Sequence, residues 1–264
     1  MAGKIDKSLL MLDSVTRGGV EGRIDVDPRS ILLVTVVYLC MMLGVPTMHI
    51  DVLLWFALYP IIASPLFGLS YSSVFLQSLI VLPLVLLLGM FNPIIDRTLV
   101  AVHNGIYITR GWLLFFGVIV RGILSMQALL ILIRSIGFTG IVRAMMRLGV
   151  PGFFATQLMM VFRYIRVLIE EGLTMKAARD ARSFGKKGLS IKLWGVMIGQ
   201  LFLRSVDRAE RVHRAMLARG FNGTVPLDFA GMSTWGWGST VFLVVWSLVF
   251  LFLRLFNLSL LFVK

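Results

Sequence analysis

Side chains that could bind a metal or act as nucleophiles are few and widely separated in this sequence of 264 residues. The three histidines, His49, His103 and His213, lie in different segments and include no pair four residues apart. Cys40 is the only cysteine, so the chain cannot form an internal disulfide. Because transition metals are held by clusters of His, Cys and carboxylate ligands, we expect this chain to bind no metal.

The sequence also lacks the residue patterns that are typical of carboxylate catalysis and of phosphate binding. Glu170 and Glu171 are neighbours in the chain, which places their side chains about 100° apart on a helix rather than together on one face. Gly185-Lys186-Lys187-Gly188 is a basic turn without the loop length of a phosphate-binding Walker motif. The sequence therefore predicts a non-catalytic chain that binds no cofactor, and any ATP energy that it uses must come from a partner protein.

Two short sequences of the same chemistry occur 37 residues apart, Ala181-Arg182-Ser183 and Ala218-Arg219-Gly220. One interpretation is a capped helix end, because Arg in the last turn favours the negative end of the helix dipole and a following Gly adopts a left-handed conformation. The other interpretation is a pair of exposed arginines that insert into acidic grooves on two related partners, because a guanidinium binds carboxylates in a planar fork. Spacing alone leaves both interpretations open.

The composition indicates a membrane protein with several spans. Hydrophobic residues make up 58% of the chain, 15% are charged, and the mean hydropathy is +0.90. Ordinary soluble proteins contain roughly 45–50% apolar residues, so this chain has too few polar side chains to cover a soluble core. Most of the net charge of +13 lies in residues 134–220, which contain sixteen Lys and Arg but only five Asp and Glu.

The distribution of apolar residues predicts an all-α polytopic membrane protein. A spanning helix needs about 20 mainly apolar residues, and five segments fit: Ile31–Val45, Val52–Phe67, Ser73–Phe91, Trp112–Ile133 and Trp237–Leu255. The expected organisation is a polar N-terminal arm in residues 1–30, four transmembrane helices in 31–134, a domain of long amphipathic helices in 135–225 and a final transmembrane helix in 236–262.

Residues 135–225 are too polar to lie in lipid and too apolar for a flexible loop. Apolar residues recur every three or four positions from Phe154, which predicts an amphipathic helix to about Ser183. A second helix is predicted from Gly188 to Gly220, with acidic-then-basic pairs four residues apart in its second half. Two long helices of this kind between membrane spans are expected to form a docking surface for partner proteins. Because loops rich in Lys and Arg stay on the cytoplasmic side of the membrane, we expect this surface and the N-terminus to lie in the cytoplasm and the C-terminus to lie outside.

Two charged residues, Arg121 and Arg254, fall inside predicted spans. An ionisable residue within a span is a functional hypothesis by default. The structural alternative is that the guanidinium reaches the membrane interface or binds a backbone carbonyl. No Asp or Glu falls inside the predicted spans, which disfavours a carrier driven by an acidic proton or sodium relay.

Three passages of the sequence match the pattern of a known family: Asn92-Pro93-Ile94-Ile95-Asp96-Arg97; Phe162-Arg163-Tyr164 with Leu168-Ile169-Glu170-Glu171, leading to Ala181-Arg182-Ser183; and Arg208-Ala209-Glu210-Arg211-Val212 with Ala215-Met216-Leu217-Ala218-Arg219-Gly220-Phe221. In these passages the sequence resembles the transmembrane T component of energy-coupling factor (ECF) transporters, specifically the CbiQ-like cobalt branch. The resemblance follows the chain in order over nearly its whole length. Ser183 stands where many members have Gly, a change between small residues that keeps the arginine.

The resemblance implies a coupling subunit in the plasma membrane of a prokaryote. Two cytoplasmic ABC ATPase subunits would bind and hydrolyse ATP, and a small CbiM-like membrane subunit would capture cobalt. This chain would join them within the lipid bilayer, with no nucleic acid among its partners. Arg182 and Arg219 would each insert into one ATPase, and Arg121, Asp96 and Arg97 are candidate contacts with another subunit. Nickel or a vitamin would suit the same coupler, because specificity would lie in another chain.

Two other classes of protein share some of these features with a coupling subunit. A conventional ABC permease docks its ATPases through one Glu-Ala-Ala loop with a downstream Gly. Glu171-Gly172 is at best a weak match to that loop, and a single loop does not explain two Arg motifs. A lipid-binding membrane protein or enzyme would use the basic region to hold anionic lipid, at about 1 kcal/mol per surface Lys or Arg. That interpretation predicts basic residues spread over one face and a catalytic cluster within reach, and neither is evident.

Overall fold

The computed structural model describes residues 26–47, 50–96, 98–102, 106–182, 191–223 and 236–262. Several residues discussed above lie outside these ranges: His49, Arg97, His103, Ser183, the turn 185–188 and residues 1–25 of the predicted N-terminal arm. The described residues form two compact units. The membrane unit contains those in 26–144 and 236–262, and the helix-pair unit contains those in 145–223.

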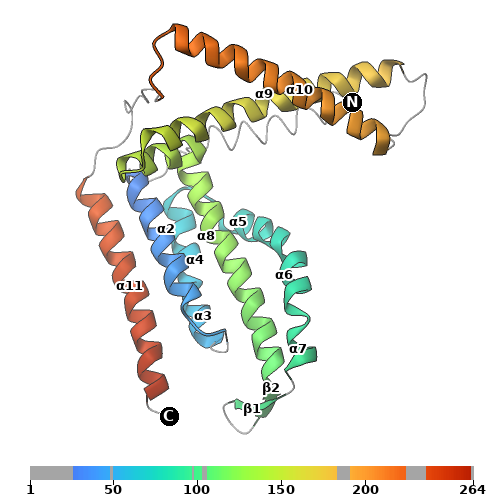
Figure 1. Cartoon of the computed structure of the whole chain (residues 1–264). Coiled ribbons are helices and arrows are strands. Elements are labelled where there is room, and N and C mark those ends of the chain that lie inside the picture. Colours follow the sequence, from blue (N-terminus) through green and yellow to red (C-terminus); the bar gives the residue numbers. More distant parts are fainter. Residues whose placement is uncertain are drawn as a thin grey trace. The chain divides into compact units, whose positions relative to one another are not determined.

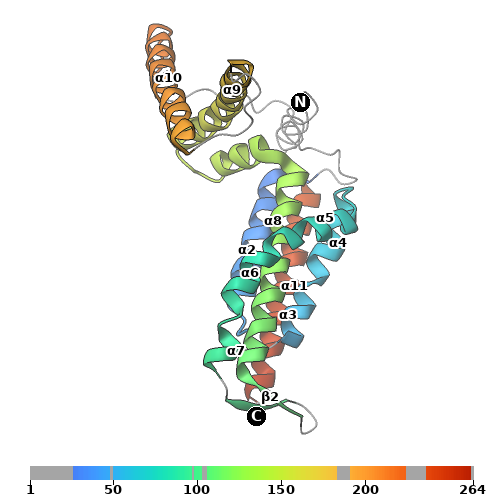
Figure 2. The ribbon, with the colours of Figure 1, turned by 90° about the vertical axis from the view of Figure 1, so that its right-hand side faces the viewer.

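The apolar helices of the membrane unit coincide with the five predicted spans. The first two spans are α2 (Pro28–Leu43) and the pair α3 (Ile50–Phe56) and α4 (Leu58–Leu66). The third contains α5 (Tyr71–Ser78), the 3-10 turn η1 (Leu79–Val81), α6 (Leu82–Gly89) and α7 (Asn92–Ile95). The last two are α8 (Arg110–Arg147) and α11 (Trp237–Phe262). Figure 1 and Figure 2 show α2, α8 and α11 running lengthwise through this unit, and the expected all-α membrane fold is confirmed.

Among the residues that the structure describes, four helical stretches are long and apolar enough to cross a membrane: Tyr71–Ile95, Arg110–Arg147, Gly152–Arg182 and Trp237–Leu255. Pro28–Leu43 and Val52–Leu66 are shorter apolar helices. Gly152–Arg182 corresponds to the first helix that the sequence places in the cytoplasm. This helix is counted among the possible membrane spans because its first half is apolar. Its location on the cytoplasmic side stays a prediction.

Two features of the membrane unit were not predicted. The polar stretch after the third span contains an antiparallel hairpin of β1 (Leu99–Val102) and β2 (Ile106–Thr109). The fourth helix, α8, continues beyond the predicted end at Ile133 and kinks at Gly137, where φ is 66° and ψ is 169°, a conformation essentially confined to glycine. Three residues before the kink, Arg134 donates hydrogen bonds to Ser73 and Gln77, which joins α8 to α5.

Aromatic side chains form the centre of the membrane unit. Tyr38 of α2 lies between Tyr59 of α4 and Phe250 of α11, with ring centroids 4.7 and 5.2 Å away. The Trp246 ring meets Tyr59 edge-on at 4.9 Å. The Tyr38 hydroxyl donates to the carbonyl of Phe56 at 3.2 Å, which satisfies its polar end inside an apolar cluster.

The beginning of α2 is fixed by Asp27, which is fully buried. Its carboxylate accepts from the backbone N–H of Arg29 at 2.9 Å, and Pro28 occupies the first helical position, where a missing N–H costs nothing. The Asp27 N–H donates to Ser239 Oγ at 2.8 Å. This bond connects the first turn of α2 to the first turn of α11, although 212 residues separate them.

The helix-pair unit contains two long helices, α9 (Gly152–Arg182) and α10 (Ile191–Ala218). Their bounds agree closely with the two predicted amphipathic helices. Apolar spacing of three and four residues identified α9, and an apolar first half followed by acidic-then-basic pairs identified α10. Pro151 and Gly220 mark the positions where the chain enters α9 and leaves α10.

Candidate functional site

The first Arg motif lies at the C-terminal end of α9. Ala181 and Arg182 are the last two residues of this helix and both are exposed. Arg179 lies one turn earlier and pairs with Asp180 at 3.1 Å. Positive side chains here lie beside the unpaired carbonyls of the last turn, where the helix dipole favours cations.

The second Arg motif forms the end of α10. The N–H of Gly220 donates to Leu217 O and the N–H of Phe221 donates to Met216 O, both at 3.0 Å, which is the Schellman arrangement of a helix end. Gly220 has φ of 79°, a left-handed conformation that favours glycine. Ala218 and Arg219 are exposed on this turn. The cap fixes the backbone and leaves the Arg219 side chain in solvent, so the two interpretations of the motif are compatible.

The two Arg motifs lie at opposite ends of the helix pair. Figure 1 shows α9 and α10 crossing in opposite directions, so that their C-terminal ends point away from one another. Helices of 31 and 28 residues are about 47 and 42 Å long at 1.5 Å per residue. Arg182 and Arg219 therefore do not form one site, and a single small ligand could not contact both.

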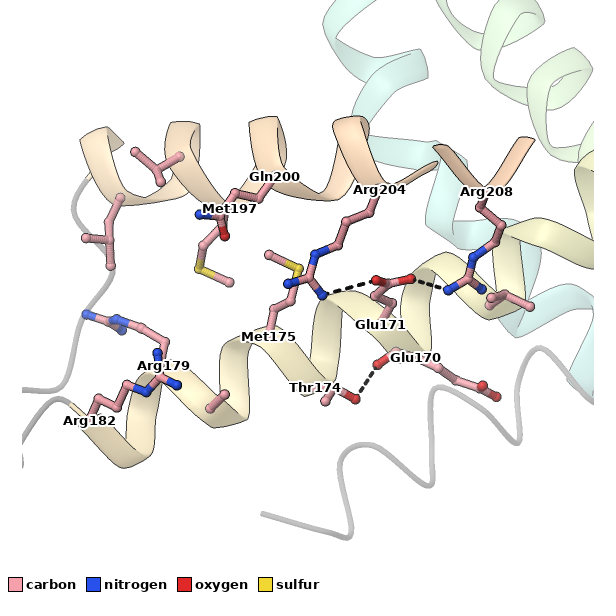
Figure 3. A pocket seen from close by; sticks show the side chains of 14 residues that line it. Glu170, Glu171, Thr174, Met175, Arg179, Arg182, Met197, Gln200, Arg204 and Arg208 are labelled. Carbon is pink, nitrogen blue, oxygen red and sulfur yellow. Dashed lines mark hydrogen bonds and ion pairs between the residues drawn. The ribbon is translucent and has the colours of Figure 1, made fainter. Parts of the chain in front are cut away.

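An ion-pair fork joins the two helices between these ends. Glu171 of α9 accepts from Arg204 at Oε1, 3.3 Å away, and from Arg208 at Oε2, 2.8 Å away, and Figure 3 shows both contacts. The Glu171 side chain is only 17% exposed. In the sequence, Glu171 stands out as half of a possible carboxylate pair, as a weak permease signal and as part of the family resemblance, but nothing there identifies its two arginine partners. The sequence feature that could have indicated this contact is the pair Arg204 and Arg208, four residues apart on α10, which an acidic side chain on another helix can join.

A groove of about 690 Å³ lies beside this fork between α9 and α10. Figure 3 shows Arg179 and Arg182 at one end of the groove, Met175 and Met197 at its middle and the Glu171 fork at the other end. The groove therefore has an apolar centre and cationic ends.

The neighbouring face of the pair is apolar. A second groove, of about 510 Å³, shares Met175 and Met197 with the first and is otherwise lined mainly by apolar side chains, among them Ile165, Trp194 and Ile198. These three side chains are well exposed, at 41%, 48% and 59%. The helix pair thus presents a charged groove and an apolar groove on the two sides of its methionines.

Arg121, a candidate subunit contact from the sequence, has a partner within this chain. Its Nη2 donates to the carbonyl oxygen of Val45, just beyond the end of α2. The unpaired carbonyls at a helix C-terminus attract a guanidinium by hydrogen bonding and through the dipole. This geometry matches the structural alternative stated for Arg121, and its role in subunit contact stays a prediction.

Asp96, the second of these candidates, lies where α7 meets the hairpin. Its carboxylate accepts from the Thr98 hydroxyl at 2.6 Å and from the Thr98 N–H at 3.2 Å, and Arg110 Nε lies 3.5 Å away. These hydrogen bonds, and then the charge of Arg110, lower the pKa of Asp96 below its ordinary value. The Asp96 carbonyl also accepts from the N–H of Gly111, which joins the turn to the start of α8.

Possible metal ligands are not gathered in the described part of the chain. Within it, no group of three or more His, Cys, Asp or Glu side chains could hold a metal ion. His213 lies on α10, apart from the charged groove, and Cys40 is exposed on α2.

Comparison with known proteins identifies the family of this chain. The family model described as CbiQ, cobalt transport protein, matches residues 22–228, which include both Arg motifs, the fork and the Asp96 turn. Two uncharacterized proteins of Methanocaldococcus jannaschii are similar over shorter stretches. MJ1571 is 35% identical over 85 residues, 31% of this chain and 29% of that protein. MJ1089 is 31% identical over 117 residues, 44% of this chain and 42% of that protein.

The two alignments therefore span less than half of either relative. The family match extends over most of this chain and runs through the helices of both units. The chain belongs to the CbiQ family of cobalt transport proteins, the transmembrane T components of ECF transporters.

Proposed function

We propose that this chain is the coupling subunit of an ECF-type importer. It transmits ATP-driven motion from two cytoplasmic ABC ATPases to a small membrane subunit that captures the substrate, with cobalt as the cargo. The observation that carries the proposal is the placement of Arg182 and Arg219, each exposed at the C-terminal end of one helix and at opposite ends of one pair.

Two separated arginines suit two separate but related partners. A guanidinium at a helix end projects beyond the helix and offers a planar fork of donors to carboxylates. Because the two ends of the pair point in opposite directions, each arginine could enter an acidic groove of a different ATPase subunit. Closing of the ATPase pair would then act on both helices at once.

The two faces of the helix pair support two kinds of contact. The charged groove suits a polar, cytoplasmic protein surface. The apolar face with Ile165, Trp194 and Ile198 suits lipid or the apolar surface of a membrane subunit. A chain with these two faces can contact ATPases and a membrane partner through the same helices, which is what a mechanical coupler requires.

A conventional permease and a lipid-binding protein account for less of this geometry. One ATPase-docking loop leaves the second Arg motif without a role. Lipid binding explains the basic charge but does not require arginines at opposite ends of a crossed pair. The coupling subunit accounts for both motifs and for the apolar face.

The proposal is tested by tagging the C-terminus, extracting the protein from its native membrane in mild detergent and identifying what copurifies. An ABC ATPase together with a small polytopic subunit would support the proposal. A chain that emerges alone, under conditions in which other ABC complexes survive, would contradict it. Cobalt bound to the small subunit would support the cargo assignment, whereas nickel or a vitamin would keep the coupler and replace the cargo.

A matched pair of variants tests the arginines themselves. Replacing Arg182 and Arg219 together by Glu should abolish uptake while the protein still inserts in the membrane. The control variant, Lys176→Glu with Arg211→Glu, reverses two exposed charges within the same helices. This variant should remain bound to the ATPases. Wild-type uptake by the doubly changed Arg182 and Arg219 variant would show that these arginines do not couple.

A further inference from the structure

The fork at Glu171 holds α9 and α10 at two points. Each carboxylate oxygen has its own arginine, and Arg204 and Arg208 lie one turn apart on α10. A single ion pair allows its two helices to slide and rotate about one contact. Two contacts one turn apart resist both sliding along α10 and rotation about its axis.

The fork is more shielded than the Glu210–Arg214 pair within α10. The Glu171 side chain is 17% exposed, Arg208 is 36% exposed and Arg204 is 58% exposed. The Glu210–Arg214 pair on α10, at 3.1 Å, has side chains that are 62% and 80% exposed. Exposed pairs contribute little because water and salt screen them, whereas charge-assisted bonds in a shielded position are stronger.

Unfilled space lies on both sides of the fork along the helices. The groove of about 690 Å³ extends from Glu171 toward Arg182 at the end of α9. Another groove, of about 410 Å³, extends the other way, between Gln157 of α9 and Met216 of α10, and includes Arg208. The helices therefore separate on either side of the fork, and close side-chain packing does not fix their crossing angle along the whole pair.

We propose that Glu171 is the positioning residue of the helix pair. Its fork with Arg204 and Arg208 is the pivot at which α9 and α10 cross, and the flanking grooves give the two helices room to change their crossing angle. The fork thereby sets the separation of Arg182 and Arg219. This inference rests on the proposed function, because that separation matters for transport only if both arginines insert into ATPases.

The first experiment measures the crossing in the full chain alone, in lipid nanodiscs. Pairs of spin labels are placed on a Cys40→Ser background, one pair on each side of the fork. Ala177→Cys with Gly195→Cys reports one side; both positions are exposed, and a Cβ at Gly195 meets nothing within 4 Å. Phe154→Cys with Ala215→Cys reports the other side, where both positions are also exposed.

The variants isolate the fork. Glu171→Gln keeps the shape of the side chain and removes its charge, leaving two arginines of like charge one turn apart, which repel. The control, Glu210→Gln, removes the same charge from an exposed pair within one helix. The rescue variant inverts the fork completely, with Glu171→Arg, Arg204→Glu and Arg208→Glu together.

In the chain alone, we expect Glu171→Gln to broaden both distance distributions about twofold, the control to leave them unchanged, and the inverted fork to narrow them again. Distributions in Glu171→Gln that match the wild type would overturn the pivot. So would broadening in Glu210→Gln of the same size, since the effect would then not depend on contact between the helices.

The second experiment uses the complex purified with its ATPases and capture subunit, in nanodiscs for distances and in liposomes for uptake. ATP with vanadate should change both label distances in the same direction, because opening a crossed pair about a central pivot separates the arms on both sides. Glu171→Gln should lower substrate taken up per ATP hydrolysed by about fivefold or more, a usual size for a coupling between sites. The ATPase rate should stay within about twofold, and the inverted fork should restore uptake.

The outcomes separate this inference from the proposed function. Broadened distributions in the chain alone, together with a wild-type chain that binds no ATPase, would leave the pivot intact and contradict the coupling function. An unchanged crossing with lost uptake would overturn the pivot, since Glu171 would then act through a partner. ATP-driven distances that change in opposite directions on the two sides would also overturn it, because the helices would be sliding.

Discussion

Arg121 on α8 donates a hydrogen bond to the carbonyl oxygen of Val45, 76 residues earlier in the chain. This bond satisfies a carbonyl just beyond the C-cap of α2 and joins that end of α2 to the first third of α8. In a hydrocarbon environment no water replaces such a partner. The intramembrane arginine therefore has a structural reason to be where it is.

We expect Arg121→Ala to destabilise the membrane unit by about 1–3 kcal/mol, the cost of leaving a shielded polar group without its partner. Thermal unfolding of the purified chain in nanodiscs measures this. Arg121→Lys keeps one charged donor and should lose less. If the alanine variant unfolds at the wild-type temperature but no longer assembles with the capture subunit, Arg121 is a subunit contact instead, as the sequence alone first suggested.

Most of the fold follows from residue patterns that are local in the chain. Mainly apolar stretches located the spans. Apolar spacing of three and four residues located α9 to within a few residues, and an apolar first half followed by acidic-then-basic pairs did the same for α10. Gly220 predicted the end of α10, because a left-handed cap needs glycine. These features could be predicted because each depends on residues within one or two helical turns.

Contacts between distant segments could not be predicted in the same way. The Glu171 fork joins residues 33 and 37 positions apart, and the Asp27 bond to Ser239 joins residues 212 positions apart. A charge pattern shows that a partner is needed but not which helix supplies it. The kink at Gly137 was missed because the predicted fourth span ended at Ile133, four residues before this glycine.

The cap at Gly220 gives a prediction about how Arg219 is presented. With φ of 79°, any residue with a Cβ is strained there, by about 1–2 kcal/mol, whereas Asn tolerates this conformation better. We expect Gly220→Val to fray the last turn of α10, increase hydrogen exchange at Arg219 and Phe221, and weaken binding of an ATPase. Gly220→Asn should behave almost like the wild type. Equal exchange in the two variants would show that the Schellman bonds do not depend on the left-handed residue.

The Asp96 turn gives a prediction about pH. Hydrogen bonds from Thr98 and the charge of Arg110 lower the Asp96 pKa in the folded chain below the value of about 3.9 in an unfolded one. The stabilisation from the ionised carboxylate is therefore fully present above about pH 4 and is lost as the pH falls through the lower, folded pKa. We expect hydrogen exchange at Thr98, corrected for its intrinsic rate, to show constant protection between pH 5 and 8.

Asp96→Asn should reduce that protection at pH 7, because a neutral amide oxygen accepts weaker hydrogen bonds from Thr98 than a carboxylate does and no longer attracts Arg110. Thr98→Val is the matched control, since it removes the hydroxyl donor and keeps the charged pair. It should reduce protection less than Asp96→Asn does. Protection that rises on acidification from pH 8 to 5 would contradict the direction assigned to the Asp96 pKa.

The last prediction separates the charge of Arg182 and Arg219 from their shape. Lysine keeps the positive charge at each helix end but replaces a planar fork by a single rotating donor group. Each hydrogen bond to a charged partner contributes about 1.5–3 kcal/mol. We therefore expect Arg182→Lys with Arg219→Lys to weaken ATPase binding by about tenfold or more, since 1.4 kcal/mol corresponds to tenfold. Binding measured against salt concentration distinguishes the cases: a lysine variant with wild-type affinity and the same salt dependence would mean that the two helix ends act only as positive charges, and the planar fork would have no part in coupling.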